Sequence, residues 1–235
     1  MDAQRLIELE RQFAPGIGKG DGVFSPKDRN PHAPWNLGGD KMAPDRNGYA
    51  DVYARLLDEM APRLIVELGV FQGASIAMWC ELFPEAQVVG LDLSLDRYHA
   101  NLYALRERGA FTVNTPLLHE WDAYADEAEF LRDLGDIDVF VDDGPHTRDA
   151  IVNVLNLVGP LMADGGVYVI EDFPGGDRLL ADQFPQAEIV RAGRLNADLV
   201  LTRLAGYTIA IIRTLGRRLQ RIPQRAGIGQ GPVGQ

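Results

Sequence analysis

Residues 64–75 read L-I-V-E-L-G-V-F-Q-G-A-S, and this stretch decides the predicted fold. Its apolar start, Leu64 to Val66, is typical of a short strand buried on both faces of a parallel sheet. Glu67 ends the run, glycines follow, and apolar residues at helical spacing come next. A strand, a glycine turn and a helix in this order predict a Rossmann-like doubly wound α/β sheet, which binds ligands beyond the carboxyl ends of its strands.

The glycine spacing indicates which ligand the turn accepts. Gly69 and Gly73 are four residues apart, and Phe71 stands where a dinucleotide-binding turn has the glycine that lets the backbone touch a pyrophosphate. The turn therefore favours a ligand without phosphates, such as S-adenosylmethionine. We expect Ser75 to cap the helix that follows. The E-x-G-x-x-x-G-x-S pattern resembles motif I of the class I methyltransferases, and the alternative is an ordinary strand-to-helix turn.

The composition restricts the class of protein. The chain has 235 residues, a net charge of −11 and one cysteine. An acidic surface argues against nucleic-acid binding, and a single cysteine fits a reducing, cytoplasmic compartment without disulfides. The most apolar C-terminal region, Leu199 to Leu215, contains two arginines and is too short to span a membrane. The first residues predict an amphipathic helix rather than a signal peptide.

The order of segments predicts three parts. Residues 1–48 combine the first helix with a Gly/Pro-rich, lid-like segment, and residues 49–215 form the α/β domain. Residues 187–191, 198–203 and 207–214 read as strands, the last two as an antiparallel hairpin at the edge of a mostly parallel sheet. Residues 216–235 form a basic tail that we expect to be disordered.

Two acids fall where a nucleoside would bind. Asp92 follows the predicted second strand, about 20 residues beyond the glycine turn, and such an acid accepts both ribose hydroxyls. NAD and S-adenosylmethionine share that ribose. A third strand is predicted over 111–114, and Asp122 lies beyond it, where it would accept from the adenine amino group or cap a helix. Tyr49 and Tyr53 share one helix face, to pack in the core or to reach the ligand.

Two later strands each end in paired carboxylates. Asp142 and Asp143 follow I-D-V-F-V, with His146 three residues on, and Glu171 and Asp172 follow V-Y-V-I. Neighbouring parallel strands bring these acids together, and carboxylates without a basic partner repel one another unless a cation lies between them. Oxygen ligands favour Mg²⁺ or Mn²⁺. Such a cation would lower the pKa of a substrate hydroxyl, with His146 as general base. The alternative is a tight turn and a polar strand end.

The blocks V-D-D-G-P-H and G-G-V-Y-V-I-E-D are similar to those of the metal-dependent macrolide and sugar O-methyltransferases of antibiotic biosynthesis. The G-G-D-K segment, with the two tyrosines after it, also resembles that family. The similarity extends from about Asp40 to Asp172. Pro145 departs from the family pattern, and a longer N-terminal oligomerisation region of the family is not found, so a homo-oligomer is left open.

The resemblance implies roles for particular residues. Asp143, Glu171 and Asp172 would hold Mg²⁺, and His146 would take the proton from the acceptor. The residues expected to bind S-adenosylmethionine are Tyr49, Glu67, Gly69, Gly73, Ser75, Asp92, Asp122 and Asp142. The predicted activity is O-methylation of a small hydroxylated acceptor, such as a sugar or a glycosylated natural product.

Three alternatives are left open by the sequence. One is a metal-independent methyltransferase, which would keep its activity in EDTA. Another is an NAD(P) oxidoreductase of the same topology, against which Phe71 argues. The third is a non-catalytic protein that binds S-adenosylmethionine.

Overall fold

The computed structural model describes residues 1–14, 41–42, 47–58, 60–125, 127 and 129–172, together with the backbone of 188–191 and 208–213. Most of the predicted lid-like segment, the predicted strand over 198–203 and the predicted tail over 216–235 lie outside these residues. The proposed division at residue 49 stays a prediction.

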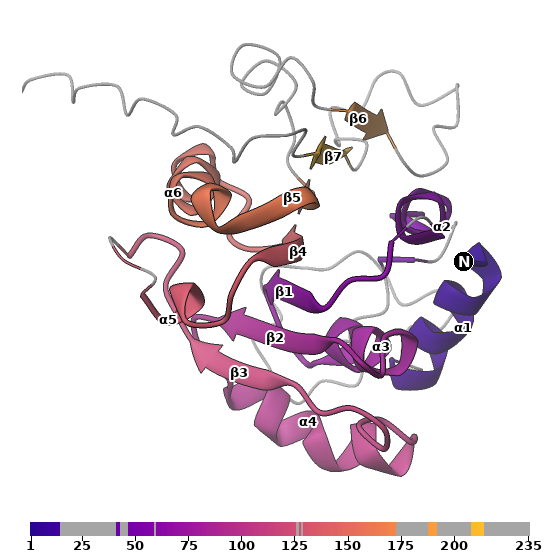
Figure 1. The fold of residues 1–235 in the computed structure, drawn as a ribbon. Coiled ribbons are helices and arrows are strands. Elements are labelled where there is room, and N and C mark those ends of the chain that lie inside the picture. The colour runs from indigo at the N-terminus through magenta and orange to yellow at the C-terminus, as the bar shows by residue number, and fades with distance from the viewer. Residues whose placement is uncertain are drawn as a thin grey trace, which may run out of the picture.

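Seven strands form one sheet, in the order β3-β2-β1-β4-β5-β7-β6 (Figure 1). The strands are β1 (Leu64–Leu68), β2 (Gln87–Asp92), β3 (Leu117–Glu120), β4 (Ile137–Asp142), β5 (Met162–Ile170), β6 (Glu188–Arg191) and β7 (Thr208–Arg213). The pairs that join β3, β2, β1, β4 and β5 are all parallel. The strand order reverses between β1 and β4, which is where open α/β sheets bind their ligands.

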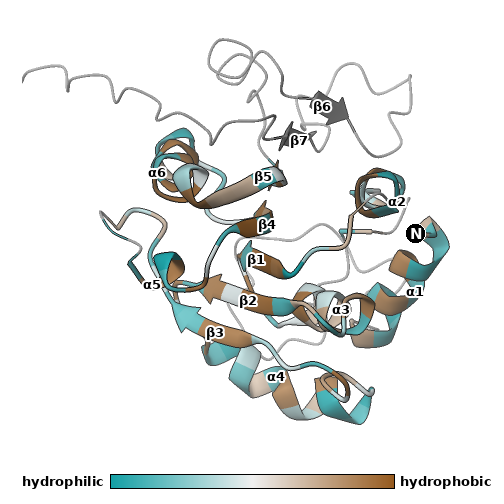
Figure 2. Cartoon of the chain, viewed as in Figure 1, coloured by the Kyte–Doolittle hydropathy of each residue, from teal (hydrophilic) through white to brown (hydrophobic). Residues whose placement is uncertain are grey.

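Helices cover both faces of the sheet (Figure 1). They are α1 (Ala3–Phe13), α2 (Ala50–Asp58), α3 (Ala74–Leu82), α4 (Asp96–Glu107), α5 (Glu129–Arg132) and α6 (Arg148–Val158), followed by the short 3-10 helix η2 (Gly159–Leu161). One core cluster joins the sheet to α1, α2, α3 and α4, and the other joins it to α5 and α6. Figure 2 shows α1, α2 and α6 divided into hydrophobic and hydrophilic sides, as a helix that covers a core requires.

The strands alternate between these two clusters. In β1, Ile65 belongs to the α1–α4 cluster, whereas Leu64 and Val66 belong to the α5–α6 cluster. All five residues of β1 are buried, as predicted for a central parallel strand. This period of two also decides the direction of each side chain at the strand ends.

The predicted third strand is wrong. Residues 111–114 form a turn, with Phe111 in the left-handed conformation, and β3 lies at Leu117–Glu120 instead. The apolar pattern of F-T-V-N has no neighbour with which to pair, whereas Leu117 aligns with Val89 of β2. The pairing partner, and not the local pattern, therefore fixes this strand.

Two further boundaries differ from prediction. The helix expected over 150–162 ends at Val158, and the A-D-G-G segment expected as a turn lies inside β5. The pairing of β5 with β4 shifts its register there, because Ile137 aligns with Met162 and Val139 with Val167. Extra residues in one strand are accommodated as an irregularity of the ladder rather than as a break.

The far edge of the sheet contains antiparallel pairs. β7 pairs antiparallel with β5, and β6 pairs antiparallel with β7. The predicted hairpin of residues 198–203 and 207–214 is not tested, because its first strand lies outside the part of the chain that the structure describes.

Candidate active site

The glycine turn brings β1 against the end of β4. Gly69 has a φ of +98°, and a Cβ atom there would lie 2.2 Å from the carbonyl oxygen of Asp143. Gly73 has a φ of +85°, and its Cβ would lie 2.6 Å from the Tyr98 ring. Neither position accepts a side chain, so the two glycines let the backbone approach closely.

Ser75 does not cap α3. The cap residue is Gly73, and no side chain caps the helix there. Ser75 lies in the first helical turn and is half-buried. The reason is backbone geometry, because Gly73, in the left-handed conformation, occupies the N-cap position of α3. A cofactor contact of Ser75 stays a prediction.

Asp92 is held by the glycine turn. Its Oδ2 accepts from the backbone N–H of Phe71 at 2.8 Å, and its Oδ1 accepts from the N–H of Ser94 at 3.3 Å. The Arg97 guanidinium carbon lies 4.9 Å from the centre of the Phe71 ring. Asp92 therefore stands beside the turn at the end of β2, the place predicted for an acid that holds a ribose.

Asp122 lies on a loop that is hydrogen-bonded to α6. Its Oδ1 accepts from the N–H of Tyr124 at 2.9 Å, which makes it a turn residue rather than a helix cap. The hydroxyl oxygens of Tyr124 and Thr147 lie 2.6 Å apart. Asn153 of α6 donates to the carbonyls of the loop residues Ala123 and Ala125, at 2.8 Å each.

Strand alternation brings three acids to one face. Glu67, Asp143 and Glu171 continue the positions of β1, β4 and β5 that face the α1–α4 cluster. Asp142 belongs to the opposite face, where it accepts from the Tyr168 hydroxyl at 2.9 Å. Burial raises the pKa of Asp142 to about 6. One oxygen of Asp142 is therefore already bonded to Tyr168, and the predicted contact of Asp142 with the cofactor stays a prediction.

Lys41 lies among the three acids, which the sequence analysis did not foresee. Its Nζ lies 2.7 Å from Glu67 Oε1, 3.1 Å from Glu171 Oε2 and 3.3 Å from Asp143 Oδ2. The expectation that these carboxylates have no basic partner is therefore wrong. The only signal in the sequence was the G-G-D-K resemblance, which gave Lys41 no role.

Burial and charge oppose each other in this cluster. Burial lowers the pKa of Lys41, but the carboxylates of Glu171, Glu67 and Asp143 outweigh it and hold the pKa well above its usual value. Burial raises the pKa of Asp143 to about 6 and that of Glu171 well above its usual value, although Lys41 lowers both. The ammonium group therefore stays charged, and it partly offsets the effect of burial on the two acids.

Glu67 is fully buried and is occupied on both oxygens. Oε1 pairs with Lys41, and Oε2 accepts from the Trp79 indole N–H at 3.0 Å. The Tyr53 ring packs on the Trp79 ring, with 5.3 Å between the ring centres. Any cofactor contact of Glu67 would have to share these partners, so the predicted contact stays untested.

Tyr49, which precedes α2, and Tyr53, within α2, donate to the acids that follow β5. The Tyr53 hydroxyl donates to Glu171 Oε1, and the Tyr49 hydroxyl donates to Asp172 Oδ1. The Asn47 amide lies 3.3 Å from each oxygen of Asp172. Tyr49, predicted to bind the cofactor, therefore contacts a predicted metal ligand. Burial raises the pKa of the Tyr53 hydroxyl well above its usual value, so that this group remains a donor.

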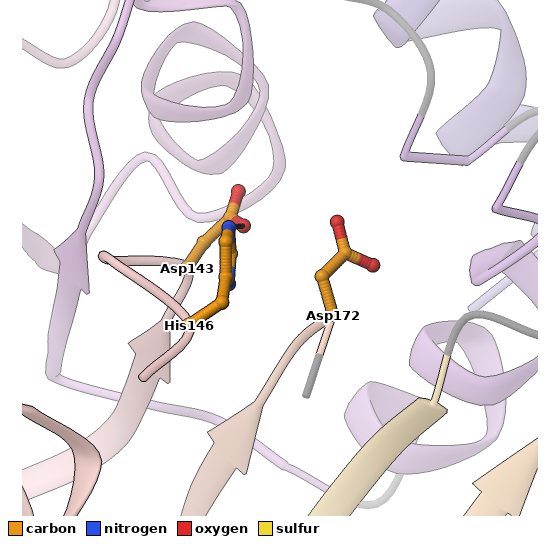
Figure 3. Close-up of side chains that lie close together, drawn as sticks. All are labelled: Asp143, His146 and Asp172. Carbon is orange, nitrogen blue, oxygen red and sulfur yellow. Dashed lines mark ion pairs between the residues drawn. The ribbon is translucent and has the colours of Figure 1, made fainter. Parts of the chain in front are cut away.

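Asp143, His146 and Asp172 offer donor atoms to one space (Figure 3). One donor atom from each lies within 4.8 Å of the others, and His146 Nε2 is 3.8 Å from Asp143 Oδ1. His146 has a φ of 54° and Asp172 a φ of 49°, both left-handed. Such backbone strain in residues other than glycine is concentrated at functional sites.

The described residues fit both groups that the fold implies. Three carboxylates (Glu67, Asp143 and Glu171) lie within 3.3 Å of one ammonium group, and Asp172 lies beside Asp143. Negative charge is therefore left for a cation, for which Asp143 and Asp172 supply oxygen ligands. At the glycine turn, Gln72 Oε1 is buried and has no hydrogen-bond partner among the described residues. Asp92 accepts from the Phe71 N–H of the same turn and offers a carboxylate to the hydroxyl groups of a nucleoside.

Comparisons with known proteins agree with the fold. Residues 66–173 match the family described as a methyltransferase domain. The solved methyltransferase MycE of the mycinamycin biosynthetic pathway, in complex with Mg, SAH and mycinamycin VI, has a TM-score of 0.50 and 20% identity. The alignment covers 98% of this chain and 57% of MycE. The O-methyltransferase TomG from Streptomyces achromogenes has a TM-score of 0.52 and 15% identity, over 91% of this chain and 90% of TomG.

Residues 66–173 match a methyltransferase domain, and the sheet order and the similarity to TomG confirm the predicted α/β fold class. The curated relatives of this chain are O-methyltransferases, as the sequence analysis predicted. L-olivosyl-oleandolide 3-O-methyltransferase of Streptomyces antibioticus is 29% identical over 136 residues, 53% of this chain and 31% of that protein. Mycinamicin VI 2''-O-methyltransferase of Micromonospora griseorubida is 30% identical over 119 residues, 46% of this chain and 26% of that protein.

The chain thus spans less than a third of the length of these two curated relatives. Within the described residues, no helix is long and apolar enough to cross a membrane.

Proposed function

We propose that this chain transfers the methyl group of S-adenosylmethionine to a hydroxyl group of a small molecule, with the help of a divalent cation. The observation that carries the proposal is the convergence of Asp143, His146 and Asp172, with donor atoms within 4.8 Å, next to the glycine turn of a methyltransferase domain. The names of the curated relatives support O-methylation of a sugar on a larger natural product.

Different residues of the chain would bind the cofactor and the cation. The glycine turn admits the cofactor, and Asp92 accepts from the ribose while it keeps its bond to Phe71. Asp143 and Asp172 would hold the cation, with Glu171 as the third acid implied by the resemblance. S-adenosylmethionine supplies an electrophilic methyl group, and a cation supplies positive charge that lowers the pKa of the acceptor hydroxyl.

His146 is the proposed general base. It lies at the edge of the site, with 37% of its side chain exposed, so an acceptor can reach it. Asp143 lies 3.8 Å from Nε2, and its negative charge would favour the imidazolium that forms when His146 takes the hydroxyl proton. A sugar or another vicinal diol is the proposed acceptor, because two neighbouring hydroxyl groups offer two oxygens to one cation.

A second candidate is a metal-independent methyltransferase, and Lys41 is the observation that favours it. Its ammonium group already lies within 3.3 Å of three buried carboxylates, so the site contains a cation of its own. The cytoplasmic location and the absence of nucleic-acid partners stay predictions of the composition.

The first test is methyl transfer from labelled S-adenosylmethionine to a panel of glycosylated acceptors, in Mg²⁺ and in EDTA. We expect transfer that EDTA abolishes and added Mg²⁺ restores, and a loss of roughly 10²–10⁴-fold in rate for His146→Asn. Asparagine suits this position because it tolerates the left-handed conformation.

Three results separate the candidates. His99→Asn, on the exposed face of α4, is the matched control and should keep the full rate. Transfer that persists in EDTA would favour the metal-independent candidate. Calorimetric binding of S-adenosylmethionine to the His146→Asn variant shows that a lost rate is not a lost cofactor site, and binding of NAD instead would exclude both candidates.

A further inference from the structure

The two oxygens of Asp143 face two different neighbours. Oδ2 lies 3.3 Å from Lys41 Nζ, and Oδ1 lies 3.8 Å from His146 Nε2. The carboxylate thus separates an inner position, next to Glu67 and Glu171, from an outer position, next to His146 and Asp172. The inner position is buried, and the outer position is the one with donor atoms within 4.8 Å.

The ammonium group of Lys41 fills the inner position. It has three N–H donors, and three carboxylate oxygens lie within 3.3 Å of its nitrogen. A divalent ion bonds to carboxylate oxygens at roughly 2.0–2.6 Å. An ion bonded to both Asp143 Oδ2 and Glu171 Oε2 would therefore overlap the ammonium, and one of the two cations would have to leave.

The backbone of Lys41 and Met42 is hydrogen-bonded to other parts of the protein, which opposes such a departure. Lys41 is only 8% exposed, and its carbonyl accepts from the Tyr49 N–H at 3.0 Å. The next residue, Met42, is fully buried and donates its N–H to Glu10 of α1 at 2.9 Å. Removing the ammonium would leave buried carboxylates without a counter-ion, which is strongly unfavourable.

We infer that Lys41 is a resident cation of this site and a positioning residue, which stands where the second ion of a two-metal site would lie. The inference rests on the proposed function and refines it. A divalent ion is left with the outer position, between Asp143 Oδ1 and Asp172, with His146 beside it as the proposed general base. Glu171 forms an ion pair with Lys41 through Oε2 and accepts from Tyr53 through Oε1, so we assign it to the inner position rather than to that ion.

The test is the number of Mn²⁺ ions bound, measured by calorimetric titration of the 235-residue chain. The wild type should bind one Mn²⁺. Lys41→Met removes the ammonium and keeps the length of the side chain, so it should bind one additional Mn²⁺. Lys41→Arg keeps the charge and should bind the same number as the wild type.

Two control variants locate the effect. Lys41→Met/Glu171→Gln should return to the wild-type number, because the inner position then loses one of its three carboxylates. Arg63→Met removes a positive charge from an exposed residue and should also bind as the wild type does. Lys41→Gln replaces Lys41→Met if the latter does not fold in metal-free buffer, and circular dichroism monitors the fold of each variant.

The outcomes separate this inference from the proposed function. An additional Mn²⁺ in Lys41→Met supports the inference even if the wild type binds none, a result that would reject the metal half of the proposed function. Equal numbers in the wild type and Lys41→Met overturn the inference, whether or not the wild type binds Mn²⁺. Failure of Glu171→Gln to remove the additional ion would also overturn it.

Discussion

At the scale of single residues, Lys41 changes the chemistry expected of the site. A cluster of carboxylates alone predicts a metal ion, because like charges repel in a buried space. With Lys41 at 2.7 Å from Glu67 and 3.1 Å from Glu171, part of that repulsion is already compensated. The remaining acids, Asp143 and Asp172, lie nearer the exposed His146. This division of charge is consistent with the proposed metal ligands and the proposed general base being neighbours.

Cys80 is a core residue of α3. The thiol is free and buried in α3. Burial raises the pKa of Cys80 from 9.0 to about 12. The raised pKa means that the folded protein keeps the thiol protonated at a pH where the unfolded chain would already ionise it.

We therefore predict that Cys80 does not react with a disulfide reagent in the native protein at pH 8, and reacts fully in urea. Because the unfolded thiol loses its proton first, the folded state should also lose stability as the pH rises above 9. The measurement is the release of the chromophore with and without urea. A complete reaction within minutes in native buffer would contradict the burial of this residue.

At the scale of elements, the connection from β1 to α3 joins two strand ends. Gly69 donates its N–H to the Leu91 carbonyl of β2 at 2.8 Å, and its Cα faces the carbonyl of Asp143 after β4. The turn thereby fixes the distance between the predicted cofactor site and the carboxylate cluster. A change at Gly69 should affect both.

Gly69→Ala should destabilise the protein more than Gly165→Ala. Both glycines have a left-handed backbone, which costs roughly 1–2 kcal/mol for alanine. A Cβ on Gly165 meets nothing within 4 Å, whereas on Gly69 it meets a backbone oxygen at 2.2 Å. Urea unfolding of both variants measures the difference. Equal losses of unfolding free energy would mean that strain alone, and not the contact with β4, requires the glycine.

At the scale of the whole molecule, the first helix is part of the main core. Leu6 and Leu9 of α1 are fully buried in the same cluster as α2, α3 and the sheet, and Phe13 is 1% exposed. Glu10 of α1 also accepts from the Met42 N–H, next to Lys41. The helix thus supports the segment that carries the resident cation, although the predicted domain boundary placed it in a separate part.

Leu9→Ala should lower the free energy of unfolding of the whole protein by about 2–5 kcal/mol, in one transition. Its control is Glu8→Ala, on the exposed side of the same helix, which should change stability by less than about 0.5 kcal/mol. Thermal unfolding followed by circular dichroism measures the stability of both variants. A small separate transition in Leu9→Ala, with the main one unmoved, would mean that α1 is an independent attachment.

The sequence determined the parallel sheet, the glycine turn and the acids at the strand ends, because buried strands and tight turns leave a local pattern of residues. It also predicted the methyltransferase class from Leu64–Ser75. Tertiary structure alone decided that Asp142 turns away while Asp143 turns inward, since strand register fixes the face of each side chain. Only packing could bring Lys41 to Glu67 and Glu171, because a contact between residues so far apart in the chain has no local signature.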